Sequence, residues 1–88
     1  MAFVIHPAGD VHEITPTDVT RGFTLDELYS AIGCDVVERV WASDDGMLIV
    51  DEEGLLKQLP YNHMASVITR DQIALVGVAV YCSDGEVQ

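Results

Sequence analysis

The chain has 88 residues and a mass of 9.6 kDa, enough for one small hydrophobic core and too little for two. Hydrophobic residues make up 49% of it and charged residues 22%, a mixture too apolar for intrinsic disorder and too interrupted by charge for a membrane span. Fifteen acidic residues against four basic ones give a net charge of −11, which argues against nucleic acid and anionic membranes as ligands, because Lys and Arg bind both. We expect one soluble domain over residues 1–82, followed by a polar tail over residues 83–88.

The surplus of acidic residues has two interpretations. Carboxylates spread over a small domain suit a protein partner with a basic surface. An acidic proteome or growth in high salt would give the same composition without any such partner. Both interpretations stay open, and in either case we expect no direct contact with nucleic acid or membrane.

The two cysteines, Cys34 and Cys82, are far apart in the sequence and form no metal-binding or redox motif. The first residues lead straight into an apolar run and show no signal-peptide pattern. We therefore expect a cytoplasmic protein with two free, buried thiols, and a disulfide between them is the alternative.

The first elements in chain order are two short strands. Residues 3–6 and 11–14 are rich in β-prone side chains, and a Pro-Ala-Gly-Asp turn at 7–10 separates them. This pattern predicts an opening hairpin or two neighbouring strands.

A helix follows a polar loop. Thr24 and Glu27 have the spacing of a capping box, in which each side chain binds the backbone amide of the other residue. Apolar residues then recur at helical spacing up to Gly33, which favours the left-handed conformation at a helix end. The sequence predicts a helix over residues 25–32.

The middle of the chain predicts the clearest hairpin. Residues 35–42 are rich in β-branched side chains and partly alternate with polar ones, residues 47–50 are continuously apolar, and an Asp-Gly turn lies between them. After a second acidic turn, residues 55–59 fit a further short strand that ends at Pro60.

The last third predicts a short helix and a central strand. Residues 62–68 fit either a short helix capped by Asn62 or a loop. Residues 73–82 are almost continuously apolar, as in a strand covered on both faces. The fold class is therefore α+β, with a single, mainly antiparallel sheet of about five strands and one clear helix. Because such a sheet leaves edges to protect, we also expect a homodimer.

The run from Val50 to Asn62 resembles the signature of a family of small uncharacterised proteins that are common in bacteriophages and mobile elements. The family pattern has an acidic turn with glycine, then Leu-Lys, Leu-Pro and Asn, and Lys57 and Asn62 match its Lys and Asn. The resemblance implies a domain of unknown function without an assigned activity. It also implies a phage or mobile-element origin, a context in which small acidic proteins often block host defence proteins.

The preferred site is a set of carboxylates at the two ends of the predicted strand 47–50. Asp44, Asp45, Glu52 and Glu53 would contact a basic host protein, as a DNA mimic does. The set lacks the residue pattern of a calcium loop. Ordinary solvated turns are the alternative. The expected function is a non-catalytic acidic binding protein that inhibits a host defence protein in the host cytoplasm.

A second site would bind a small ligand. Lys57, Tyr61 and Asn62 follow one another closely around Pro60, and a pocket there would suit a nucleotide signal. In this alternative the protein is a ligand sponge or sensor. The competing interpretation is structural, with Pro60 shaping a turn and Asn62 capping the next helix.

The histidines complete the set of chemically active side chains. His6 and His12 flank the first turn and would lie close across a hairpin, but no third zinc ligand is evident. His63 has no nucleophile motif near it in the sequence. We expect no catalytic residue, no metal and no cofactor.

Overall fold

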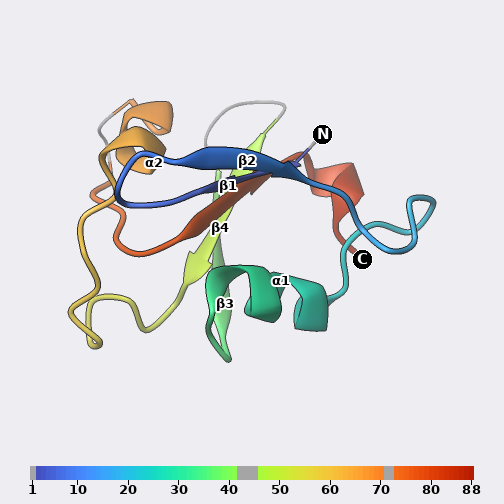
Figure 1. Ribbon diagram of the computed structural model, residues 1–88, viewed down its shortest axis with the longest axis horizontal. Coiled ribbons are helices and arrows are strands. Elements are labelled where there is room, and N and C mark those ends of the chain that lie inside the picture. Colours follow the sequence, from blue (N-terminus) through green and yellow to red (C-terminus); the bar gives the residue numbers. More distant parts are fainter. Residues whose placement is uncertain (1, 42–45, 71–72) are drawn as a thin grey trace.

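A computed structural model describes residues 2–41, 46–70 and 73–88 of the chain. They form one open antiparallel sheet of five strands in the spatial order β2-β1-β5-β4-β3. The strands are β1 (Ala2–Ile5), β2 (Val11–Ile14), β3 (Val37–Trp41), β4 (Met47–Asp51) and β5 (Ala79–Cys82). The helices are α1 (Leu25–Ile32), α2 (His63–Ile68) and the short 3-10 helix η1 (Asp84–Glu86) (Figure 1). The predicted α+β class, the five-stranded antiparallel sheet and the helix predicted over residues 25–32 are confirmed.

The two α-helices cover opposite faces of the sheet (Figure 1). Side chains alternate between the two faces along each strand, so the sheet contributes to two apolar clusters. The cluster under α1 includes Val4, Leu28, Ile49 and Val80. The cluster under α2 includes Ile5, Leu48, Val50 and Ala65. Every residue of β4 is buried, which explains the continuously apolar run over its first four residues.

β5 lies in the centre of the sheet, as the apolar C-terminal run predicted. The predicted length was wrong, because the strand covers Ala79–Cys82 and not residues 73–82. Gly77 redirects the chain before β5, with a φ of +77° in the left-handed region. A Cβ at this position would lie 2.7 Å from Cδ1 of Leu59. Residues 73–78 therefore approach the sheet as a loop.

The strand predicted over residues 55–59 is also wrong. This segment is a series of turns whose backbone groups bond locally: the amide of Lys57 donates to the carbonyl of Glu53, and that of Leu59 to the carbonyl of Gly54. Gln58 has a φ of 56°, which breaks an extended path. Local turns satisfy these amides, so they are not used for strand pairing.

Both helix caps follow the predicted chemistry. The amide of Glu27 donates to Oγ1 of Thr24 at 3.1 Å, and the amide of Thr24 donates to Oε1 of Glu27 at 2.9 Å. Gly33 ends α1 with a φ of 81°. Asn62 caps α2 by accepting a hydrogen bond from the amide of Ala65 at 3.1 Å. The ambiguous segment 62–68 is thus a helix.

The C-terminal residues contact the loop before α1. The amide of Phe23 donates to the carbonyl of Glu86 at 2.7 Å, and Phe23 forms an isolated parallel bridge with Val87. Gly22 has a φ of +92°, and an added Cβ would collide with the Glu86 carbonyl. Residues 83–88, expected as a polar tail, therefore include the short helix η1. One of them, Val87, is bridged to Phe23. Cys34 and Cys82 are free and buried, as expected.

Within the described ranges, no helix has both the length and the apolar character needed to cross a lipid bilayer.

Candidate functional site

The first candidate site is the Asp51 loop, residues 51–58, which follows β4. Asp51 closes the loop: its Oδ2 accepts a hydrogen bond from Lys57 Nζ at 2.8 Å, and its Oδ1 accepts one from the amide of Glu53 at 2.8 Å. The Asp51 side chain is only 2% exposed, whereas that of Lys57 is 40% exposed. A buried carboxylate with two donors therefore fixes the course of the loop.

The electrostatics of this pair favour its ionised form. Burial raises the pKa of the Asp51 carboxyl, but the hydrogen bonds from Lys57 and from the Glu53 amide outweigh burial and hold that pKa below its ordinary value. The hydrogen bond between Lys57 and Asp51 also raises the pKa of Lys57. Lys57 is the one basic residue of the loop sequence, and its charge is paired with Asp51.

The Asp51 loop presents two adjacent leucines to solvent. Leu55 is 77% exposed and Leu56 is 83% exposed. Exposed Glu52 and Glu53 precede them. Large apolar side chains on a loop held by hydrogen bonds to a buried carboxylate are pre-organised for contact, since little entropy is lost on binding.

A groove adjoins the Asp51 loop on the face of the sheet that carries α2. Its volume is about 170 Å³. Its apolar lining residues are Val40, Val50, Leu55, Ile73, Ala74, Leu75 and Val76. Its acidic lining residues are Glu38, Asp51 and Glu52, and among the residues that the structure describes no Lys or Arg lines it. The surface is therefore apolar with an acidic border.

The predicted carboxylate set is only partly described. Glu52 and Glu53 are exposed in the Asp51 loop, at the end of β4. Asp44 and Asp45 precede β4 in the chain and lie outside the described residues. The leucine pair beside Glu52 and Glu53 was missed by the sequence reasoning, which placed these leucines in a strand. The available signal was a Leu-Leu pair directly after an Asp-Glu-Glu-Gly turn.

The residues predicted for a nucleotide pocket do not line one cavity. Lys57 forms an ion pair with Asp51, whereas Tyr61 lines another pocket, which contains His6 and His12. Asn62 is fully buried. Its Nδ2 donates to the carbonyl of Ile5 at 3.0 Å and to the carbonyl of Gly77 at 2.9 Å. Asn62 therefore joins β1, the chain before β5 and α2, so its amide is occupied within the fold.

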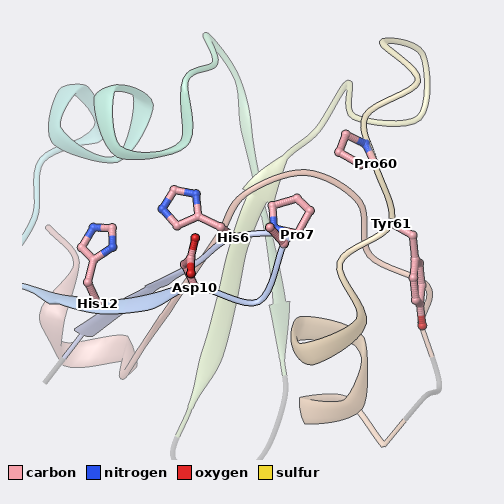
Figure 2. A pocket seen from close by; sticks show the side chains of 7 residues that line it. His6, Pro7, Asp10, His12, Pro60 and Tyr61 are labelled. Carbon is pink, nitrogen blue, oxygen red and sulfur yellow. The ribbon is translucent and has the colours of Figure 1, made fainter.

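A second candidate site is the histidine pocket, which is open and has a volume of about 670 Å³. It is lined by His6, Pro7, Ala8, Asp10, His12, Pro60 and Tyr61. The ring centres of His6 and His12 are 5.3 Å apart, with 25° between the ring planes. Figure 2 shows the two imidazoles side by side, with Pro60 and Tyr61 across the pocket. The sequence predicted that the histidines are close, but not that residues 60–61 complete the pocket.

The buried thiol of Cys34 lies near the Asp51 loop. Burial raises the pKa of the Cys34 thiol, and the nearby Asp51 carboxylate raises it further, so this cysteine is a poor nucleophile. Over residues 2–41, 46–70 and 73–88, no group of three or more His, Cys, Asp or Glu side chains is arranged to hold a metal ion.

Together these features define a small α+β domain with an open sheet, a loop closed by an ion pair and bearing two exposed leucines, and a pocket lined by two histidines. Residues 1–87 match the family described as a domain of unknown function, DUF3846, and the chain belongs to that family. The expected membership of an uncharacterised family is therefore confirmed. Comparisons with curated proteins and with solved structures found no match.

Proposed function

We propose that this protein is a non-catalytic binding domain that uses the Asp51 loop to contact a basic protein. One observation carries the proposal: Leu55 and Leu56 are more than three-quarters exposed on a loop that is closed by the ion pair between exposed Lys57 and buried Asp51. Exposed leucines cost solubility unless a partner covers them, and a fixed loop loses little entropy on binding.

The charges beside the leucines set the class of partner. Glu52, Glu53 and Glu38 are exposed around the leucines and the adjoining groove, while the nearby Lys57 is paired with Asp51. A partner with lysines or arginines around an apolar contact would complement this surface. Its association rate would fall as salt increases, because screening weakens steering between opposite charges.

The finer form of the proposal concerns biological context. We propose an origin in a phage or mobile element and a host defence protein as the basic partner, with Asp44 and Asp45 adding to the contact. The net charge of −11 supports this form, because a DNA-binding defence protein carries a basic surface that a carboxylate-rich domain complements. β2 and β3 are the two edges of the open sheet, which supports the proposed homodimer.

The test is capture of partners from a host lysate on the immobilised protein, with surface variants as comparison. Glu52→Lys/Glu53→Lys and, separately, Leu55→Ser/Leu56→Ser should each abolish capture of the same protein. Glu13→Lys/Asp26→Lys makes the same change in net charge elsewhere, and Val19→Ser removes another exposed apolar side chain, 74% exposed. Both controls should retain capture. Equal capture by all four variants would refute the proposal.

The small-ligand alternative now has a different location. The histidine pocket, with a volume of about 670 Å³, is large enough for a small ligand. Of Lys57, Tyr61 and Asn62, only Tyr61 lines it. A thermal melt with a panel of nucleotides tests this alternative, because a ligand that binds the folded state raises its Tm.

A further inference from the structure

We infer that His6 and His12 form a two-histidine site for a divalent transition-metal ion such as Zn²⁺ or Ni²⁺. The inference is independent of the proposed protein contact, because it concerns the histidine pocket and not the Asp51 loop. It rests on the geometry of the first hairpin, on the spacing of the two rings and on the charge around them.

The hairpin places both imidazoles on the same face of the sheet. His12 pairs with Val4 in the register of β1 and β2, and His6 lies two residues after Val4. The backbone around the turn is fixed, because the amide of His6 donates to the carbonyl of Asp10 at 2.8 Å and that of Gly9 donates to the carbonyl of His6 at 2.9 Å. The side chains of His6 and His12 therefore lie diagonally across from each other at the start of the hairpin turn.

The spacing of the rings fits a shared ion. Two imidazoles on one tetrahedral zinc, with Zn–N bonds of about 2.0–2.1 Å, place their ring centres roughly 5 Å apart. The observed separation of the ring centres of His6 and His12 is 5.3 Å. Figure 2 shows a ring nitrogen of each imidazole on the side that faces the other ring. Small side-chain rotations would direct both nitrogens at one ion.

The surroundings favour a cation. Among the residues that the structure describes, no Lys or Arg lines the pocket, and Asp10 contributes a carboxylate there. The net charge of −11 also raises the local concentration of cations. Imidazole nitrogen is a preferred donor for zinc, nickel and copper.

The ion would keep exchangeable ligands. His6 and His12 supply two donors, and the described residues hold no arranged group of three. Water would fill the remaining positions, and Asp10 would accept a hydrogen bond from such a water. Because the pocket is open, a donor atom of a further ligand could replace the water.

The test is a titration of Zn²⁺ and Ni²⁺ into the metal-free full chain by calorimetry. We expect one saturable site per chain. His6→Ala and His12→Ala should each lower the affinity at least about tenfold, since even loss of an outer-shell partner costs that much. His63→Ala is the matched control, because His63 is exposed on α2 and does not line the pocket, and it should bind as the wild type does.

A second measurement uses the unaltered chain, so it does not depend on whether the variants fold. Long-range ¹H–¹⁵N spectra of the imidazoles should show shifts for His6 and His12 on addition of Zn²⁺, with His63 unchanged. No saturable binding, equal shifts at all three histidines, or equal affinities for the three alanine variants would each overturn the inference.

Discussion

Lys57 Nζ donates to Asp51 Oδ2 at 2.8 Å, and this pair ties the last residue of β4 to the far end of the loop that follows. The anion is buried and the cation reaches it from solvent. Because both oxygens of Asp51 accept hydrogen bonds, this carboxylate organises the surface that carries Leu55 and Leu56.

Replacing either member of this pair should loosen the loop. Asp51→Asn keeps the shape and the acceptor for the Glu53 amide but loses the charged hydrogen bond, so we expect a loss of about 1–2 kcal/mol in the free energy of unfolding. Lys57→Met should cost more than Asp51→Asn, because it leaves a buried carboxylate without its cation. Urea denaturation of the two variants and of the wild type measures the order. The reverse order would show that the charge of Asp51 is not the organising feature.

Stability should fall in acid, with a contribution from the same carboxylate. The pKa of Asp51 is held below its ordinary value of 3.8, so the folded state binds its proton less readily than the unfolded state does. Its stabilisation is complete above the unfolded pKa and is lost as the pH falls from about 4 through the lower, folded pKa. Hydrogen bonds from the amides of Thr24 and Thr17 lower the pKa of Glu27 in the same direction. Tm measured between pH 2 and about 6 should drop less steeply for Asp51→Asn than for the wild type. Parallel curves would contradict the assignment.

Asn62 should be among the most sensitive positions of the chain. Asn62→Ala leaves the carbonyls of Ile5 and Gly77 without a donor and removes the cap of α2. Unpaired buried acceptors and a lost cap together should cost about 3 kcal/mol or more. Thr15→Ala, at an exposed polar position, is the control and should stay within about 0.5 kcal/mol of the wild type. A mild effect at Asn62 would mean that water replaces its amide.

Gly22 should tolerate no side chain. Its φ of +92° and the adjacent Glu86 carbonyl both oppose a Cβ, so Gly22→Ala should lose about 2 kcal/mol or more and release the C-terminal residues. Gly85→Ala is the matched control, because an added Cβ there meets nothing within 4 Å. Hydrogen exchange at the amides of Phe23 and Gln88 reports the release directly. Unchanged protection in Gly22→Ala would contradict this role.

Local signals in the sequence were sufficient for most of the fold. The capping box at Thr24, the end of α1 at Gly33 and the central place of the final strand each depend on a few neighbouring residues or on apolar density. The two errors in the strands have different causes: local turns shape residues 55–59, and a distant contact shapes residues 73–78. Gly77 bends beside Leu59, which is far away in the sequence, so the apolar run before it does not join the sheet.

The site was harder to predict than the fold, because it depends on which side chains a loop leaves exposed. The spacing of His6 and His12 follows from one local turn and was expected. The exposure of Leu55 depends on how Asp51 and Lys57 close their loop, and apolar residues after a turn usually indicate a strand. Sequence pattern alone does not separate an apolar residue that is buried from one that is presented to a partner.

The two exposed leucines should therefore contribute nothing to the stability of the isolated domain. Leu55→Ser/Leu56→Ser should leave the Tm unchanged within about 2 °C, because these side chains are nearly as exposed in the folded state as in the unfolded state. Leu48→Ala, at a position with 0% exposure in β4, should instead cost about 2–5 kcal/mol. Both variants are compared with the wild type by thermal melting at low protein concentration. A large loss in the leucine double variant would show that these side chains already pack against protein, such as a second copy of the chain. In that case the loss should grow with protein concentration, since association stabilises by mass action.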